Sequence, residues 1–215
     1  MKTNLSLKIT LIAFLIFSLA GCTFIFQTGR RSDMQKIKEL SDQLDELNQT
    51  KKLLEDRLSQ EIKDKQVKLE MMGKGLVITF VADILFDSGK AKIKPEAYPV
   101  LDKVARVLKE NVPTNDIGIE GHTDNQPIKF SGWKSNWELS SERALSVLHY
   151  LVDEKGISPE RVSAIGYGEF RPVTSNDAKG GRQLNRRVEV VILPQVAKAK
   201  EKKSHRLSEP QGNLK

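Results

Sequence analysis

The feature that most constrains the fold is an alternation of two apolar patterns between Gly75 and Leu193. Short runs rich in β-branched residues are typical of strands, and longer segments with apolar residues at every third or fourth position are typical of helices. The expected strands are Leu76 to Phe80, Ile117 to Glu120, Val162 to Tyr167 and Arg187 to Leu193. With one helix after each of the first two strands, the order β-α-β-α-β-β predicts a two-layer α/β (α+β) domain, a mixed sheet with both helices packed on it.

Start and stop signals set the limits of the two helices. The first begins at Lys94-Pro95-Glu96, because proline is tolerated in a first helical turn, and ends near residues 111–113. The run Ser135 to Glu138 forms a capping box at the start of the second helix, and Gly156 ends it. The polar segment 168–183 is expected to be a loop.

The segment before this domain is predicted to be helical. From Ser32 to Glu70 the chain has no proline or glycine and is dense in charged residues and glutamine. A heptad pattern, apolar at six of eight sites, favours a coiled coil with a partner helix: Ile37, Leu40, Leu44, Leu47, Lys51, Leu54, Leu58 and Glu61. The alternative is a single solvated spacer helix, since Lys51 and Glu61 weaken the pattern. A helix of this length would span about 58 Å.

The N-terminus has the layout of an export signal. Lys2 and Lys8 precede an apolar run from Ile9 to Ala20, which is shorter than the roughly 20 residues of a membrane span. The sequence Leu19-Ala20-Gly21-Cys22 resembles a lipobox, so Cys22 is expected to be acylated and to hold the chain on a lipid bilayer. The alternative is an unpaired thiol in a membrane anchor, since short membrane segments do occur. With a single cysteine no intrachain disulfide can form.

Net charge argues against nucleic acid as a partner. The formal charge of +7 falls to +5 without residues 1–21, and +4 of that lies in residues 195–215. The excess is therefore a terminal tail, expected to be disordered, and not a basic face with interleaved aromatic residues. The predicted organisation is a signal peptide (1–21), a lipid-anchored linker (22–31), a helical or coiled-coil spacer (32–72), a globular domain (73–194) and a basic tail (195–215).

Several motifs in series resemble one known family over Val77 to Leu193. They are Leu85-Phe86-Asp87, Gly121-His-Thr-Asp-Asn-Gln-Pro-Ile128, Ser135-Asn-Trp-Glu-Leu-Ser140, Glu142-Arg-Ala144, Gly166-Tyr-Gly-Glu169, Arg171-Pro172 and Asn185-Arg-Arg-Val-Glu189. The chain is identified by these motifs as similar to the OmpA-family peptidoglycan-binding domain. Two of them, Asn125 to Ile128 and Ser135 to Ser140, are most similar to the MotB branch, whereas the lipobox points to a Pal-like lipoprotein.

The resemblance implies peptidoglycan as the ligand, held through the diamino acid of its peptide stem, typically diaminopimelate. An ammonium is met by a carboxylate, and a carboxylate by a planar guanidinium that donates two parallel hydrogen bonds. The resemblance assigns these roles to Asp124 and Arg143. The further residues that it implies for the pocket are Asn136, Leu139, Phe86, Asp87 and Arg187.

Each end of this clamp has a simpler interpretation. Asp124 after a strand is also a common turn or cap residue, and Arg143 is also a surface charge that pairs with Glu142 or Glu138. Trp133 and Trp137 invite sugar stacking, but Trp137 is expected to plug the edge of the core, and both stay outside the predicted site.

The motifs favour a binding protein over an enzyme. His122 and Asp124 lack a third metal ligand nearby in sequence, and His149 lies farther along the helix. His122 is expected to be structural, hydrogen-bonded at the turn. No catalytic or phosphate-binding motif is present, so we expect no catalytic activity, no metal and no cofactor.

Alternatives are a MotB-like stator or scaffold and, with less support, a cell-wall hydrolase. A stator needs an acidic residue within a membrane helix, and Asp33 comes only after the apolar run. Thr23 after the cysteine favours the outer membrane, facing the periplasm, over the inner membrane.

Overall fold

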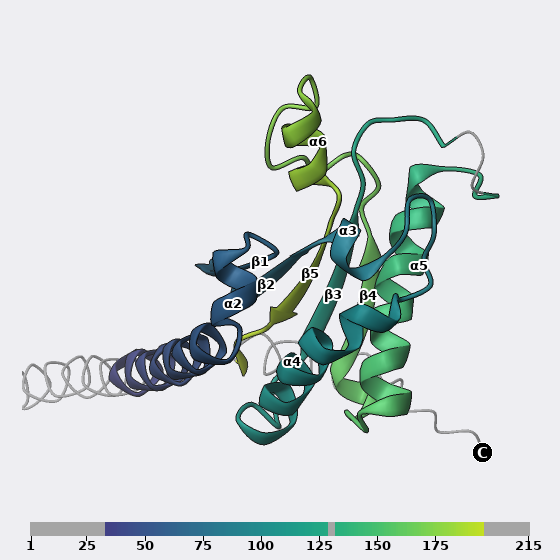
Figure 1. Cartoon of the computed structure of the whole chain (residues 1–215). Coiled ribbons are helices and arrows are strands. Elements are labelled where there is room, and N and C mark those ends of the chain that lie inside the picture. The colour runs from purple at the N-terminus through teal and green to yellow at the C-terminus, as the bar shows by residue number, and fades with distance from the viewer. Residues whose placement is uncertain (1–32, 129–131, 196–215) are drawn as a thin grey trace, which may run out of the picture. The chain divides into compact units, whose positions relative to one another are not determined.

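The computed structural model describes residues 33–128 and 132–195, and its centre is a five-stranded mixed sheet (Figure 1). The strands are β1 (Val67–Met72), β2 (Gly75–Val81), β3 (Ile117–His122), β4 (Val162–Gly166) and β5 (Arg187–Ile192), in the order β1-β2-β5-β3-β4. Only the β3 and β4 pair is parallel. The predicted two-layer α/β fold is therefore confirmed, with five strands in place of four.

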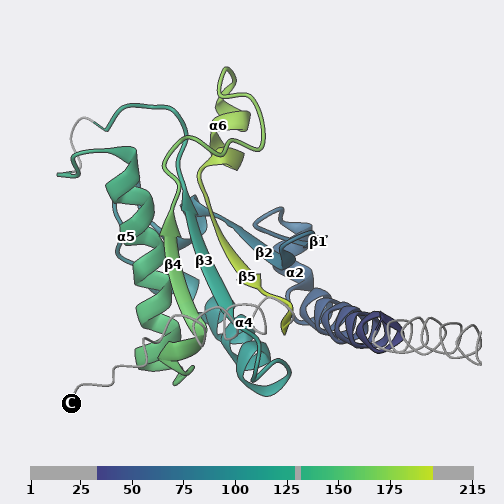
Figure 2. The ribbon, with the colours of Figure 1, turned by 180° about the vertical axis from the view of Figure 1, so that it is seen from behind.

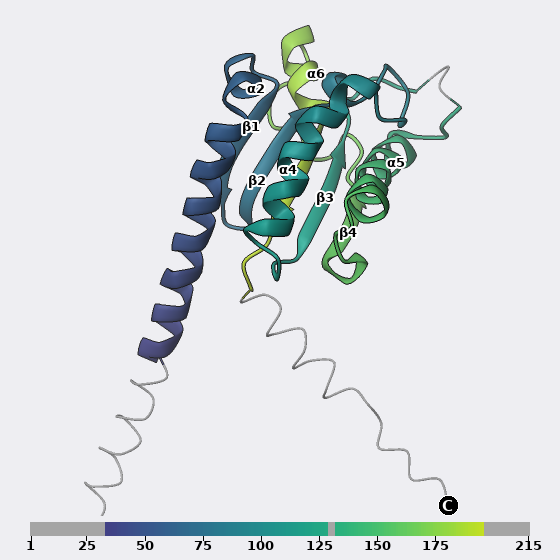
Figure 3. The same cartoon turned by 60° about the horizontal axis from the view of Figure 1, so that its bottom comes forward.

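Two long helices, α4 (Tyr98–Glu110) and α5 (Asn136–His149), cover one face of the sheet (Figure 3). Ser135 caps α5 as predicted, because its side chain accepts a hydrogen bond from the Glu138 amide at 3.4 Å. The helix continues as one π-helical turn (Tyr150–Glu154), and the chain turns away at Gly156, where φ is 68°. Short helical turns complete the fold: α2 (Ser59–Lys63), α3 (Ala82–Leu85), Pro95–Ala97, Pro159–Arg161 and α6 (Lys179–Asn185).

Strand β1 lies where the sequence predicted helix, so the prediction of helix up to Glu70 is wrong for this segment. The turn between α2 and β1 contains Lys65 with a φ of 56°, a left-handed conformation that a helix does not contain. Beyond it Val67, Leu69 and Met71 alternate with charged residues and pack toward the core. This period of two is a strand signal that the absence of proline and glycine obscured.

The expected heptad partner is, for half of the pattern, the domain itself. A continuous helix at residues 33–57 leads to α2, and Leu47, Leu54 and Leu58 are buried in the same core as the sheet. Glu61 pairs with Lys103 of α4 at 2.6 Å. Ile37 and Leu40 are exposed. The compact unit that holds the sheet accordingly begins at Leu44.

Helix α6 lies in the segment predicted to be a loop. Its sequence, Lys-Gly-Gly-Arg-Gln-Leu-Asn, has no apolar face to bury, and its one leucine, Leu184, is exposed. The sequence therefore carried no periodicity from which this helix could be predicted.

Alternation along β3 and β5 sends successive side chains to opposite faces of the sheet. Ile119 and Val190 are a paired example that faces the helices, whereas Glu120 and Glu189 are paired on the other side. Seen from behind, the middle of β3 and β5 is not covered by a helix (Figure 2). Both strands can therefore position polar groups away from the core.

No helix within the described ranges is both long and apolar enough to span a bilayer. The apolar run 9–20, Cys22 and the basic tail beyond Gln195 lie outside the described residues.

Candidate functional site

A groove of about 750 Å³ opens where β3 ends, between the start of α5 and the segment that leads from α3 to α4. Six of the seven ligand-binding residues predicted from the sequence line it, namely Phe86, Asp87, Asp124, Asn136, Leu139 and Arg143. Three charged residues outside the predicted site, Asp83, Lys94 and Arg186, line it as well. Residues more than 100 positions apart thus meet in one groove.

Arg143 is the most unusual group in the groove, because its guanidinium is buried without a carboxylate partner. The residue is 4% exposed, its Nε donates to the Lys90 carbonyl at 3.0 Å, and its Nη2 donates to the Asp87 carbonyl at 3.4 Å. The guanidinium carbon lies 5.2 Å from the centre of the Phe86 ring. Within the described ranges no carboxylate reaches Arg143 at ion-pair distance.

The electrostatic environment of Arg143 is correspondingly unfavourable. The pKa of Arg143 is lowered to about 10, chiefly by burial. Of the smaller effects, Asp83 raises it, Arg186 lowers it and Asp124 raises it, in decreasing order. Arg143 therefore stays positively charged at neutral pH, and the cost of burying that charge is not offset by an ion pair. The alternative interpretation of Arg143, as a surface charge paired with Glu142 or Glu138, is wrong, since Arg143 is buried and lines the groove.

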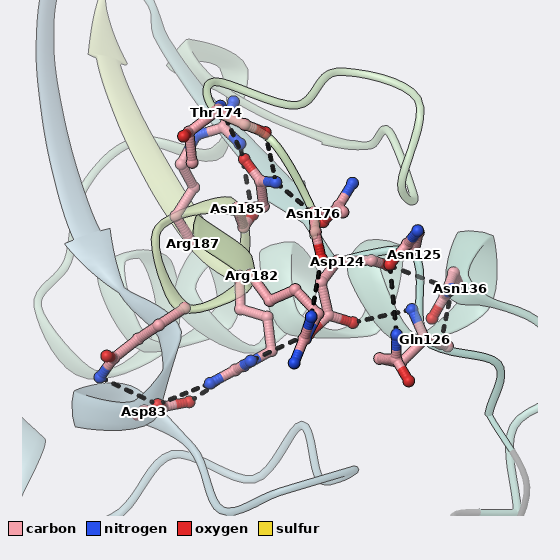
Figure 4. Close-up of polar contacts among 12 residues, drawn as sticks. Asp83, Asp124, Asn125, Gln126, Asn136, Thr174, Asn176, Arg182, Asn185 and Arg187 are labelled. Carbon is pink, nitrogen blue, oxygen red and sulfur yellow. Dashed lines mark hydrogen bonds and ion pairs between the residues drawn. The ribbon is translucent and has the colours of Figure 1, made fainter. Parts of the chain in front are cut away.

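Asp124 lies on the other wall of the groove and is 6% exposed. Its Oδ2 accepts from Arg186 Nη1 at 2.9 Å, and its Oδ1 accepts from the Gln126 amide at 3.1 Å. Arg186 also donates through Nη2 to Asp83 Oδ2 at 2.9 Å. Asp124 is thus both a turn residue and a member of an acidic pair that shares one arginine (Figure 4).

Asn136 fixes the turn that carries Asp124. Its Nδ2 lies 3.1 Å from the Gln126 carbonyl, 3.4 Å from the Asp124 carbonyl and 2.7 Å from Glu169 Oε2. Figure 4 shows Asn136 beside Asp124 and Gln126. Because one amide group contacts both ends of this turn, Asn136 holds Asp124 at the groove wall.

The remaining groove residues provide apolar surface and a rim. Phe86 is buried beneath the guanidinium of Arg143, and Leu139 is buried one turn before Arg143 on the same helix face. Asp87 contacts Arg143 through its carbonyl, while its carboxylate is exposed and pairs with Lys90 at 3.1 Å. The groove therefore has an apolar floor between a cation and an anion.

The structure does not bring Arg187 into the groove, which corrects its predicted place in the pocket. It is buried on the face of the sheet opposite the helices, where its Nε donates to Glu189 Oε1 at 2.6 Å. Its neighbour Arg186 takes the groove position. Strand alternation explains the difference, because two adjacent residues point to opposite sides and the motif alone does not say which.

Asn185 anchors the chain directly before the two arginines. It is fully buried, its Oδ1 accepts from the Val173 and Thr174 amides at 2.9 and 3.1 Å, and its Nδ2 donates to the Thr174 carbonyl and to Asn176 Oδ1 (Figure 4). This network ties the residue before Arg186 to the preceding loop. Sequence reasoning missed Asn185 as a positioning residue.

His122 belongs to a second buried cluster, on the face that holds Arg187. Its Nε2 lies 3.8 Å from Glu120 Oε2 and 3.9 Å from Glu189 Oε1, so one nearby carboxylate comes from its own strand, two residues earlier, and the other from β5. Lys74 Nζ bridges Glu120 and Glu189 at 2.7 Å each. We refer to Lys74, Glu120, His122, Arg187 and Glu189 as the rear cluster.

The prediction that His122 is hydrogen-bonded at the turn is wrong. Neither ring nitrogen has a hydrogen-bond partner among the described residues, and the ring stacks on Tyr167 at 5.2 Å. Burial lowers the pKa of His122 more than the two carboxylates raise it, so the ring is neutral at neutral pH. Because Lys74 and Arg187 together neutralise the two carboxylates, the rear cluster is a structural ion network.

Comparison with known proteins gives consistent results. The model of the OmpA family matches residues 85–186. Motility protein B of Bacillus subtilis (strain 168) is 41% identical over 168 residues, which is 78% of this chain and 60% of that protein. The uncharacterized protein YtxE of the same organism is 36% identical over 170 residues, 77% of this chain and 69% of that protein. The chain thus spans less than two thirds of Motility protein B.

Solved structures agree with these matches. The cell wall anchor of the T6SS from Pseudomonas aeruginosa is similar with a TM-score of 0.60 and 33% identity, over 66% of this chain and 96% of that one. A MotB-like protein from Desulfovibrio vulgaris is similar with a TM-score of 0.66 and 26% identity, over 72% of this chain and 94% of that one. The fold is therefore shared with these two proteins.

Proposed function

The chain belongs to the OmpA family, and from this membership and the charges of its groove we propose that it binds peptidoglycan without catalysing a reaction. The ligand is the free end of the stem diamino acid, of the diaminopimelate type. This end carries an ammonium and a carboxylate a short distance apart. The groove offers an anion and a cation on facing walls, with apolar surface between them.

One observation carries the proposal, the buried and unneutralised guanidinium of Arg143. A ligand carboxylate in the groove would supply the missing counter-charge and accept two parallel hydrogen bonds from the planar group. Such an ion pair is formed in a site largely removed from water, where it is stronger than on the surface. The site is therefore organised for an anionic group before the ligand arrives.

Asp124 is proposed to receive the ligand ammonium. Within the described part of the chain its Oδ1 accepts only from the Gln126 amide, and its Oδ2 shares Arg186 with Asp83. Arg186 can retain Asp83 when an ammonium takes its place beside Asp124. Phe86 and Leu139 would contact the methylene chain of the ligand, and Asn136 would keep the Asp124 turn in position.

A tethering role extends this proposal to the whole chain. We propose that acylation of Cys22 holds the protein on a membrane, with the outer membrane favoured, and that the helix and domain face the periplasm. The similarity to the T6SS cell wall anchor supports attachment of an envelope structure to the wall. Homo-oligomerisation is proposed only through the exposed part of the heptad pattern, Ile37 to Leu44. The later leucines of the pattern are already buried in the domain core, namely Leu47, Leu54 and Leu58.

A stator or scaffold role is the second candidate function. The 41% identity to Motility protein B is the specific observation that favours it. Complementation of a non-motile strain that lacks its own motility protein B separates the two roles. Restored swimming supports the stator, and wall binding without swimming supports the tether.

Co-sedimentation with purified peptidoglycan sacculi tests the proposed function directly. The protein should be made as residues 23–215, because β1 and the segment up to Leu58 complete the core, and a fragment from residue 71 would lack this segment and most of β1. Binding that is displaced by free diaminopimelate is expected. Absence of pelleting by a folded protein would refute peptidoglycan binding, and release of soluble muropeptides would refute the non-catalytic assignment.

A further inference from the structure

Two aromatic side chains form an exposed stacked pair next to the groove. Trp137, in the first turn of α5, is 48% exposed, and Phe170, in the loop after β4, is 61% exposed. Their ring centres are 5.0 Å apart with an interplanar angle of 22°. The prediction that Trp137 plugs the core edge is therefore wrong, and we call this pair the aromatic platform.

Trp133 shows by contrast what a structural tryptophan looks like in this protein. Its indole Nε1 donates to the Gly89 carbonyl at 2.8 Å and so ties the chain before α5 to the segment that lines the groove. The indole nitrogen of Trp137 makes no such hydrogen bond among the described residues. Trp137 thus leaves much of a large apolar surface in water without a structural reason visible in its contacts.

The aromatic platform adjoins the groove through one hydrogen bond. Asn136, which lines the groove, donates to Glu169 Oε2 at 2.7 Å, and each of these residues directly precedes one of the two aromatic residues. The Asn136 and Glu169 pair therefore lies between the Asp124 turn and the platform. A ligand that leaves the groove past Asn136 would meet the platform next.

The loop that carries Phe170 is held rigidly. The Gly168 amide donates to Ser140 Oγ at 2.9 Å, and the Gly168 carbonyl accepts from the Thr123 amide at 2.9 Å. Gly168 has a φ of 55°, and a Cβ there would lie 3.4 Å from the indole of Trp137. The platform is therefore fixed on α5 and β3 in advance of any ligand, which lowers the entropic cost of binding.

The surroundings of the platform indicate what kind of group it takes. Two rings flanked by the charged residues Glu169 and Arg171 form too small an apolar surface for a stable protein interface, which needs roughly 800 Å² on each partner. A sugar ring presents an apolar face of C–H groups and a rim of hydroxyls. It matches an aromatic face bordered by a carboxylate, since one face needs burial and the rim needs hydrogen bonds.

We propose that the aromatic platform is a glycan subsite, which stacks against a sugar ring of the strand whose peptide stem occupies the groove. This inference rests on the proposed function and adds a sugar contact to it. In peptidoglycan the stem is covalently attached to a sugar, so one ligand can occupy the groove and the platform together. The platform then favours peptide still attached to glycan over free peptide.

Isothermal titration of three probes tests the subsite. They are a diaminopimelate-containing tripeptide, the same peptide on its N-acetylglucosaminyl-N-acetylmuramyl disaccharide, and peptide-free glycan oligomers. In Trp137→Ala and Phe170→Ala, affinity for the disaccharide-peptide is expected to fall about three- to tenfold, the range of one aromatic contact. Affinity for the tripeptide should not change.

Two further variants make the result specific. Trp137→Leu keeps apolar area but removes the flat ring, so it should behave like Trp137→Ala if stacking matters. Leu184→Ala on α6 removes an equally exposed apolar residue away from the platform and should leave all affinities unchanged. Thermal melting of each variant establishes that the fold is intact.

The outcomes separate this inference from the proposed function. Equal losses for the tripeptide and the disaccharide-peptide, or no loss for either, would overturn the glycan subsite while leaving the groove intact. If the wild-type protein fails to bind the tripeptide but binds glycan oligomers through Trp137, the groove proposal fails and the subsite stands.

Discussion

The groove and the rear cluster are two buried sets of charges built on the same pair of strands, and they differ in how those charges are neutralised. In the rear cluster Glu189 has both Lys74 and Arg187, and Glu120 has Lys74. In the groove Arg143 has, among the residues that the structure describes, only backbone carbonyls as hydrogen-bond acceptors. A buried charge with internal partners stabilises the fold, whereas one without them is available to a ligand.

Where the extended chain enters β5, adjacent residues serve the two sets. Arg186 lines the groove and Arg187 belongs to the rear cluster. Asp124 follows His122 by two positions, after the strand has ended. Neighbouring residues therefore have different roles. Those of the rear cluster contribute to the stability of the fold, and those of the groove to ligand affinity.

The largest expected effect is on stability, from Arg187→Met. The change leaves Glu189 buried without its 2.6 Å partner, and breaking a buried ion pair by removing one member costs about 3–5 kcal/mol. Denaturant unfolding should show this loss in the free energy of unfolding. A loss below about 1 kcal/mol would mean that Lys74 alone neutralises the carboxylates and that Arg187 is not structural.

For Arg143→Met we expect the opposite, a large loss of ligand affinity with little change in stability. Affinity for the diaminopimelate tripeptide should fall about 30-fold or more, since loss of one member of a buried charged pair costs about 2–5 kcal/mol. The free energy of unfolding should change by less than about 1 kcal/mol, because the lost hydrogen bonds are offset by removing a charge whose pKa burial lowers to about 10.

Arg143→Lys is the matched control for this prediction. It keeps the positive charge but not the two parallel donors, so it should bind more weakly than the wild type and more tightly than Arg143→Met. Equal binding by the lysine variant and the wild type would show that Arg143 acts as a point charge only.

A smaller effect is expected from Lys74→Met, which leaves Glu120 buried without its ammonium. Because Lys74 is itself partly exposed, the loss at neutral pH should be about 1–2 kcal/mol. In the variant the pKa of Glu120 should rise above its unfolded value, so the carboxyl takes up a proton as the pH falls through that pKa. The deficit in the free energy of unfolding should then shrink at about pH 5. A deficit that does not depend on pH would contradict this account.

The sequence predicted the groove residues better than the rear cluster, for a physical reason. Asp124, Asn136, Leu139 and Arg143 lie in short contiguous motifs whose local structure, a strand end and a capped helix, follows from neighbouring residues. The rear cluster instead joins the β1–β2 turn, β3 and β5, and strand pairing between distant segments is not written in any one of them.

The helix before the domain was also predicted only in part. A heptad pattern predicts that an apolar stripe is covered but not what covers it. Leu47, Leu54 and Leu58 are covered by the chain's own core, and β1 was hidden because its alternation is short and follows a helix without a proline or glycine. Local composition predicted helix for the whole segment, and tertiary packing decided where it stopped.

The last prediction concerns the pH dependence that the rear cluster gives the fold through His122. Burial lowers its pKa below 6.5, although Glu120 and Glu189 face it from β3 and β5, and Arg187 adds to the lowering. The unfolded chain therefore binds a proton below about pH 6.5 that the folded protein does not, and stability falls as the pH decreases through this range. The loss from this residue is at most about 1.4 kcal/mol at pH 5.5.

The variant His122→Phe tests this account, because it retains an aromatic ring against Tyr167 but cannot take up a proton. It should remove the pH-dependent loss of stability, so the melting temperature should vary less between pH 7 and 5.5 than in the wild type. If the melting temperature of His122→Phe varies with pH as much as that of the wild type, the two carboxylates stabilise a protonated His122. The folded rear cluster would then carry the positive charge of this ring below about pH 6.5.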